Sequence, residues 1–168
     1  RVHPSNLAPP LLTLDAEYTT VIGKETRRRK FAELFPEEPR AENPEHTLDD
    51  GEIVPPIHIP QQSQNARCTY AESREKQSFD WATTACAIRI VMAGGKITEA
   101  SMVLGAVAPV PMPRPQAAAM LIGKEPSTKL FRRVAEKAFQ GAAPLAHNAF
   151  KLPIGKAVVR DALEQATR

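Results

Sequence analysis

The chain has 168 residues, and its apolar content of 42% is enough for the core of one ordinary domain or of two small ones. The formal net charge is only +3, with acidic and basic residues interspersed, so composition argues against nucleic acid or an anionic membrane surface as a partner. The sequence has no long uninterrupted apolar helix and no signal-peptide pattern, so we expect no membrane span.

The first predicted helix begins near Leu7. Ser5 and Asn6 come just before it and can cap its free amide groups with a side-chain oxygen. Pro9 and Pro10 fit only into its first turn, because a proline further inside would break the hydrogen bonding. The chain starts with an arginine and runs directly into this helix, so the sequence is interpreted as part of a longer protein.

Two strands are expected next, over residues 15–22 and 26–30, joined by a turn at Gly23-Lys24. The four basic residues that end the second strand, 27–30, are interpreted as its solvated edge rather than as a phosphate site. A short apolar turn of helix is expected over residues 31–35.

Residues 36–50 are acidic, rich in proline and without periodicity, so we expect a long surface loop. A turn at Gly51-Glu52 starts an apolar run, 53–59, and the two prolines inside this run confine it to the edge of a sheet. The stretch 60–65, rich in Gln and Ser, is the best candidate for a linker between two domains.

A β-hairpin is predicted around Gly94-Gly95, because two apolar runs flank this pair and glycine reaches the positive φ angles of tight hairpin turns without steric cost. The second run is expected to extend from Ile97 to Ala108, and a further strand over 67–72 precedes the hairpin. With Arg89 on the opposite face, the alternation predicts a sheet packed on one side. The residues expected on the buried face are Cys86, Ile88, Ile90, Met92, Ala100, Met102, Leu104 and Ala106.

Helices are expected after the hairpin, over about 114–122, 127–139 and 154–167. Ser127 is expected to cap the second of them, and Gly141 to follow its end. Strands followed by helices predict an α+β domain in which an antiparallel three-stranded sheet packs against helices. The helical residues expected to face inward are Leu130, Val134, Ala138, Ala157, Val158, Ala162 and Leu163.

The residues themselves indicate neither a catalytic site nor a metal site. The four histidines are scattered without metal-ligand spacing, and no nucleophile signature built on Ser/His/Asp or Cys/His occurs. Cys68 and Cys86 are far apart in predicted strands and are interpreted as small buried hydrophobic residues rather than as a disulfide or a ligand pair. The residue types and their spacing alone therefore predict a two-part α+β protein and assign no function to it.

An ordered set of short motifs resembles a known family. The motifs are His3-Pro4-Ser5-Asn6-Leu7, Gly51-Glu52-Ile53-Val54, Phe79-Asp80-Trp81-Ala82, Gly94-Gly95-Lys96-Ile97, Pro109 with Pro111 and Arg114, and Leu121-Ile122-Gly123-Lys124. Together they are similar to the C-terminal portion of the FAD-binding (medium) subunit of the molybdenum hydroxylases. This family includes xanthine dehydrogenase, aldehyde oxidoreductase and carbon monoxide dehydrogenase flavoproteins.

The resemblance implies that residues 1–60 are the C-terminal part of a two-subdomain FAD-binding domain, that 61–65 are a linker, and that 66–168 form the α+β domain that follows. In the family, the flavin is contacted by a Ser-Asp pair and by an apolar pair after a Gly-Glu turn. By resemblance, these contacts fall on Ser5, Asn6, Ile53 and Val54. From the residues alone, helix capping is the simpler interpretation of the first pair, and core packing that of the second.

The chain departs from the family pattern in three respects. Asn6 stands where the family usually has aspartate, which keeps a hydrogen-bond acceptor and loses the charge. Glu72 stands by spacing where many relatives carry a lysine close to the flavin, so that role is not transferred. The glycine-rich loops that hold the FAD pyrophosphate lie upstream of the matched region and are absent from this sequence, so the chain is not expected to hold FAD well by itself.

By resemblance, the chain belongs to the FAD-binding electron-transfer subunit of a molybdopterin-dependent hydroxylase, which passes electrons from [2Fe-2S] clusters through FAD to an external acceptor. The implied partners are the N-terminal half of the FAD domain, an iron–sulfur small subunit and a molybdopterin large subunit. The expected location is the cytoplasm, or the periplasm for an exported complex. The chain would supply no catalytic or metal-binding residue and would be inactive alone. The alternative is a cofactor-free interaction module derived from this scaffold.

Overall fold

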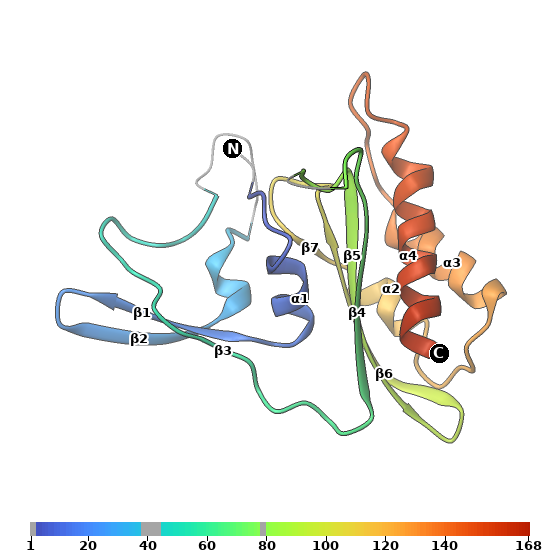
Figure 1. The fold of residues 1–168 in the computed structure, drawn as a ribbon, viewed down its shortest axis with the longest axis horizontal. Helices are drawn as coiled ribbons and strands as arrows, with labels where there is room; N and C mark the ends of the chain where they lie inside the picture. The colour runs from blue at the N-terminus through green and yellow to red at the C-terminus, as the bar shows by residue number, and fades with distance from the viewer. Residues whose placement is uncertain (1–2, 38–44, 78–79) are drawn as a thin grey trace.

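The computed structural model describes residues 3–37, 45–77 and 80–168, so Phe79 of the family motif and residues 38–44 of the expected loop lie outside the described residues. The described residues form two parts that lie side by side, one built around a small three-stranded sheet and the other around a four-stranded sheet (Figure 1). Helices cover one face of the larger sheet. The predicted α+β class is confirmed.

The N-terminal helix α1 spans Ala8–Thr13, with its two prolines in the first turn as predicted. The Ala8 amide donates a hydrogen bond to Ser5 Oγ at 3.1 Å, so Ser5 rather than Asn6 satisfies a free amide at the helix start. Helix capping is therefore one role of Ser5.

Strands β1 (Glu17–Ile22) and β2 (Glu25–Lys30) pair antiparallel across the predicted turn. The side chains of β2 are mostly exposed, and Arg28 forms an ion pair with Glu17 of the neighbouring strand. This arrangement confirms that the basic run is a solvated sheet edge.

The apolar run after Gly51 lies along the other edge of β1, as predicted. Val21 and Ile53 exchange two backbone hydrogen bonds, of 2.9 and 3.0 Å, and strand β3 (Ile57–His58) pairs with the start of β1. Between these contacts the Pro56 carbonyl accepts from the Thr19 amide at 3.1 Å, but neither proline can donate to β1, because proline has no amide hydrogen. The expected helical turn is the 3₁₀ helix η1 (Phe31–Leu34), which packs into the core of this part.

The central hairpin consists of β5 (Thr84–Ala93) and β6 (Lys96–Gly105), with β4 (Ala66–Ser73) beside β5 and a two-residue strand β7 (Met112–Pro113) beside β6. The Gly94-Gly95 pair forms the turn with φ angles of 56° and 76°, left-handed values that side chains disfavour. The predicted hairpin is confirmed, and β7 adds a fourth strand to the three that were expected.

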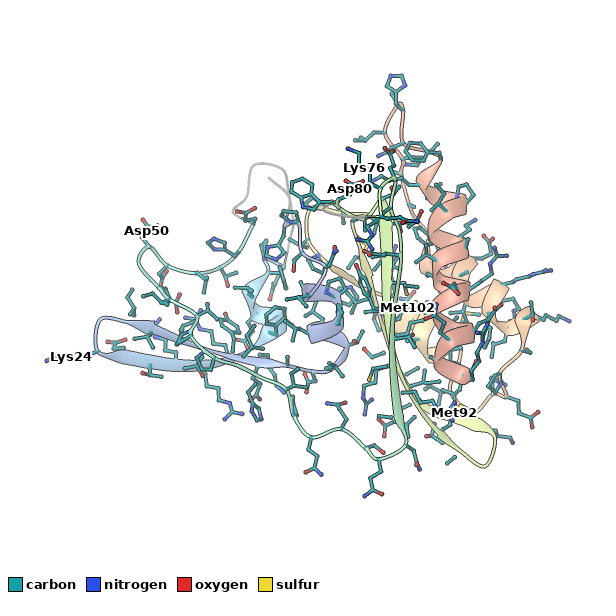
Figure 2. The ribbon with its side chains drawn as sticks, in the orientation of Figure 1. Lys24, Asp50, Lys76, Asp80, Met92 and Met102 are labelled. Carbon is teal, nitrogen blue, oxygen red and sulfur yellow. The ribbon has the colours of Figure 1, made fainter. Side chains whose placement is uncertain are left out.

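The second strand of the hairpin ends earlier than predicted. Ala106 has a φ of 60° and is exposed, so β6 stops at Gly105 instead of running to Ala108. The placement of Ala106 on the buried face was therefore wrong. Figure 2 shows Met102 in the middle of the sheet and Met92 near the turn. The other residues expected on this face are buried or half-buried against the helices: Cys86, Ile88, Ile90, Met92, Ala100, Met102 and Leu104.

Helices α2 (Pro115–Ala119), α3 (Thr128–Ala138) and α4 (Lys151–Thr167) pack on this face. Ser127 Oγ accepts a hydrogen bond from the first turn of α3 at 3.3 Å, which confirms the predicted cap. Ala157 is exposed, so its predicted inward position was wrong, because it falls outside a buried stripe that recurs every three to four residues. That stripe consists of Gly155, Val158, Val159, Ala162, Leu163 and Ala166.

The two cysteines differ in environment. Cys86 is buried as expected, and burial raises the pKa of its thiol, so it stays protonated. Cys68 is exposed, so the expectation of burial was wrong for this residue. Thr69 Oγ1 donates to the Ala162 carbonyl of α4 at 2.9 Å, which places the odd-numbered residues of β4 toward the helices and Cys68 on the other face.

The larger sheet is packed on both faces, whereas the alternation predicted packing on one. Helix α1 contacts β5 and β6 from the side opposite the three C-terminal helices (Figure 1). Gly105 permits this approach, since a Cβ placed there would lie 3.0 Å from Pro9 Cγ and 3.3 Å from Ala85 Cβ. Val110, which follows β6, is buried in the core of the N-terminal part. The two parts therefore share a packed interface.

Replacing Gly105 with alanine is expected to lower the free energy of unfolding by about 1–3 kcal/mol, because the added methyl group crowds a proline ring and a strand methyl group that cannot rotate away. Urea unfolding of the purified protein measures the change. The control Ser101→Ala, on the same face of β6, adds no atoms and is expected to change stability by less than about 0.5 kcal/mol. Equal stability of Gly105→Ala and the wild type would contradict the docking of α1 on the sheet.

Candidate functional site

A cavity of about 230 Å³ opens where the N-terminal segment meets the larger sheet. Three regions far apart in the sequence form its walls: the segment before α1, strands β4 to β6 with the loops at their ends, and the first residue of α4. We call it the interdomain cavity. The side chains that give it chemical character are His3, Ser5, Asn6, Tyr70, Trp81 and Lys151.

The N-terminal segment is fixed against the segment that follows β6. The His3 amide donates to the Pro109 carbonyl at 2.7 Å, and the His3 ring meets Phe35 edge-on with ring centroids 5.0 Å apart. Burial lowers the pKa of His3, so its imidazole is mostly neutral at physiological pH. These contacts hold Ser5 at the cavity wall and leave the exposed Asn6 amide beside it.

Tyr70 lies on the sheet side of the cavity. Its Oη donates to Glu72 Oε2 at 2.9 Å, and Glu72 also forms an ion pair with Arg74 at 2.8 Å. Burial, together with the hydrogen bond and charge of Glu72, raises the pKa of Tyr70, so its phenol stays neutral at physiological pH. The Glu72 carboxylate thus has two partners, a hydrogen bond from Tyr70 and an ion pair with Arg74.

Trp81 and Lys151 complete the cavity. Trp81 is 71% exposed, a large apolar surface to leave in water. The Asp80 carboxylate accepts from the Trp81 amide at 2.9 Å and from the Lys76 amide at 3.2 Å. Figure 2 shows Asp80 and Lys76 together at one end of the sheet. Lys151 Nζ donates to the Ala106 carbonyl at 3.2 Å. The cavity therefore combines aromatic surface, amide and hydroxyl groups, and one ammonium.

Residues 68–166 match the sequence profile of the CO dehydrogenase flavoprotein C-terminal domain. The chain belongs to this family. The predicted similarity to the C-terminal portion of the FAD-binding subunit of the molybdenum hydroxylases is therefore confirmed.

Solved structures share the fold over nearly the whole chain. Quinoline 2-oxidoreductase from Pseudomonas putida 86 aligns with a TM-score of 0.86 at 20% identity, covering 99% of this chain and 57% of that one. Reconstituted CO dehydrogenase from Oligotropha carboxidovorans aligns with a TM-score of 0.81 at 23% identity, covering 95% and 55%. CO dehydrogenase from Hydrogenophaga pseudoflava, which lacks the Mo-pyranopterin moiety, aligns with a TM-score of 0.80 at 21% identity, covering 96% of this chain and 58% of that one. This chain thus spans somewhat more than half the length of these relatives. A search of curated proteins found no match.

Only one of the two residue pairs predicted to contact flavin lines the interdomain cavity. Ser5 and Asn6 lie in its wall. Ile53 forms a bridge to Val21 at the edge of the small sheet, and neither it nor Val54 lines the cavity. Val54 is half-buried against the N-terminal core, which agrees with core packing. Ile53 is 65% exposed, so core packing does not account for it.

Sequence reasoning missed Tyr70, Trp81 and Lys151 as cavity residues. Trp81 belongs to a family motif, but a sequence does not show that an indole remains exposed. Lys151 reaches the cavity only because α4 folds back along β4 and β5. Among the described residues, no three His, Cys, Asp or Glu side chains gather closely enough to hold a metal ion. No helix in the described ranges is long and apolar enough to cross a membrane.

Proposed function

We propose that this chain is the C-terminal part of an FAD-binding electron-transfer subunit of a molybdenum hydroxylase. Membership of the flavoprotein family over residues 68–166 supports the subunit type, and the interdomain cavity supports flavin binding. In the assembled complex, electrons would pass from [2Fe-2S] clusters through FAD to an external acceptor, while substrate is oxidised at a molybdopterin centre in a partner. The isolated chain would be inactive.

The residues of the interdomain cavity fit a flavin. The exposed indole of Trp81 and the half-buried ring of Tyr70 offer the apolar surface that covers a flat isoalloxazine ring. Asn6 offers both a donor and an acceptor for the polar edge of the ring or for the ribityl chain. Lys151 contributes a positive charge that favours electron-rich oxygen atoms nearby.

When bound, FAD supplies the electron-transfer chemistry. This chain would bind and orient it. The Ser5 hydroxyl, held in place by its contact with α1, and the Asn6 amide would fix the cofactor through hydrogen bonds. Trp81 and Tyr70 would exclude water from the ring, and the neutral phenol of Tyr70 would bring no negative charge beside it.

We also propose that residues 1–60 and 66–168 act as separate domains joined by the linker 61–65. Gln62 in that linker ties the two together: its Oε1 accepts from Arg89 Nε of β5 at 2.6 Å, and its Nε2 donates to a backbone carbonyl of the first part at 3.2 Å. A linker held in this way would keep the walls of the interdomain cavity in a fixed position relative to each other.

This chain covers only 55% and 57% of two of the structural neighbours, which supports an N-terminal half as one further partner. An N-terminal half of the FAD domain would supply the pyrophosphate-binding loops and cover the exposed Ile53, which with Val54 would form the second wall of the flavin. An iron–sulfur subunit and a molybdopterin subunit would complete a cytoplasmic assembly, or a periplasmic one if exported.

A cofactor-free interaction module is the second candidate. Leu7 and Trp81 are both strongly exposed, and exposed apolar side chains of this size also suit a protein partner. Under this alternative, Trp81 would contribute to the affinity for another chain and not for FAD.

The substitution Trp81→Ala separates the two candidates. In the protein purified with its partner chains, the dissociation constant for FAD is expected to rise about tenfold, because a large aromatic contact is removed. A fluorescence titration with FAD measures this constant. Leu145→Ala is the matched control, since Leu145 is equally exposed at 76% but does not line the cavity, and it is expected to leave the constant unchanged. Unchanged FAD affinity combined with loss of a partner chain in Trp81→Ala would support the interaction module.

A further inference from the structure

A second cavity, of about 260 Å³, lies on the helix side of the larger sheet. It forms where the chain leaving β6, the end of α3 and the first turn of α4 meet, and we call it the helix-side cavity. Four apolar side chains from these separate elements form one part of its wall: Val107, Met112, Phe139 and Leu152. Such a wall suits the apolar body of a ligand.

Arg114 provides the main polar group of the helix-side cavity. Its Nε is buried and has no hydrogen-bond partner among the described residues. The backbone of Arg114 is fixed on both sides, because its amide donates to the Met102 carbonyl at 2.8 Å and its carbonyl accepts from the Ala117 and Ala118 amides at 3.1 and 3.0 Å. Burial lowers the pKa of Arg114. A buried donor without a partner is costly, so an acceptor placed here would be bound favourably.

Two further polar residues, Asn148 and Lys151, line the same cavity. Asn148 Oδ1 is also buried without a partner within the described ranges. The described lining contains these two cations, Arg114 and Lys151, and no carboxylate. Two cationic residues without a carboxylate in the lining favour an anion over a cation.

We propose that the helix-side cavity binds a small-molecule carboxylate with a compact apolar body. A guanidinium presents neighbouring N–H groups in one plane, which match the two oxygens of a carboxylate. The four apolar side chains would cover the body, and Asn148 Oδ1 would accept from a hydroxyl or amino group on it. The cavity volume of about 260 Å³ is slightly below the usual range for ligand sites, about 300–1,000 Å³, and restricts the ligand to one small molecule.

This site is separate from the proposed flavin site, although Lys151 borders both cavities. Lys151 is therefore unsuitable as the test residue, because its loss would disturb both. Arg114 lines only the helix-side cavity of the two, so its substitution isolates the carboxylate site.

Ligand-observed NMR titrations with benzoate and with its neutral isostere benzamide test the proposal on the full chain with its co-purifying partners. Benzoate is expected to bind saturably in the millimolar range, and benzamide at least tenfold more weakly. Arg114→Gln is expected to weaken benzoate binding at least tenfold, because the charged, two-point contact is lost. Arg114→Lys is expected to give an intermediate affinity. Arg132→Gln, which removes an exposed charge on α3, is the control and is expected to bind as the wild type does.

Thermal unfolding checks that each variant is folded. If Arg114→Gln does not fold, the comparison of benzoate with benzamide on the wild-type protein still tests the proposal. The proposal is overturned if benzoate shows no saturable binding or if benzamide binds equally well. It is also overturned if Arg132→Gln weakens benzoate binding as much as the Arg114 variants do. A tenfold preference for benzoate that disappears only in the Arg114 variants supports it.

Discussion

The substitution Leu163→Ala is expected to lower the free energy of unfolding by about 3 kcal/mol. Leu163 is fully buried on α4, in the core shared by the larger sheet and its helices. Removing most of its side chain loses hydrophobic transfer free energy and leaves a void that a sheet and two helices cannot readily fill. For a chain of this length, that loss corresponds to a fall in the melting temperature of about 6–12 °C, measured by calorimetry.

Leu145→Ala is the matched control for this stability measurement, because it makes the same chemical change at an exposed position. Its free energy of unfolding is expected to stay within about 0.5 kcal/mol of the wild type. If the two alanine variants unfolded at the same temperature, α4 would not pack on the sheet as described.

The substitution Ile88→Asp is expected to cost about 4 kcal/mol or more at neutral pH. Ile88 is fully buried at the centre of β5, opposite Thr69 on one side and Met102 on the other. A carboxylate introduced there would lose its hydration without gaining a cationic partner. Equilibrium unfolding in urea at about pH 8 measures the loss.

The pH dependence of Ile88→Asp gives a second check. Burial raises the folded-state pKa of the introduced carboxyl above its unfolded value, so the penalty is largest above the folded pKa and fades as the pH falls through it. The loss of stability relative to the wild type is therefore expected to be smaller at about pH 5 than at about pH 8. Ile88→Asn carries no charge, and its loss should not vary with pH in this way. A deficit for Ile88→Asp that is independent of pH would mean that residue 88 does not face the core.

The hairpin and its buried face could be predicted because their determinants are local. Glycine at both turn positions and apolar residues at every second position of β5 (Cys86, Ile88 and Ile90) act over a few residues, and the structure has the predicted turn and this buried face. The errors arose where local signals stopped. Ala106 continues the apolar pattern of β6 but adopts a positive φ. Ala157 was predicted to face inward because it is next to Val158, but the complete buried stripe of α4 leaves it exposed.

The candidate site could be predicted only in part. Ser5 and Asn6 were identified through a motif and do line the interdomain cavity. Tyr70 and Lys151 join them through long-range folding, which leaves no pattern along the sequence. The helix-side cavity has the same origin, since Arg114 and Asn148 are separated by the whole of α3 and meet only when α4 packs against the sheet.

The most direct test of the flavoprotein assignment is the visible absorption spectrum of the protein purified from its native host, with mass analysis of every chain present. We expect flavin bands together with iron–sulfur absorption, and two kinds of partner chain of the iron–sulfur and molybdopterin types. A colourless preparation that contains this polypeptide and no partner chain would contradict its role as part of an electron-transfer subunit.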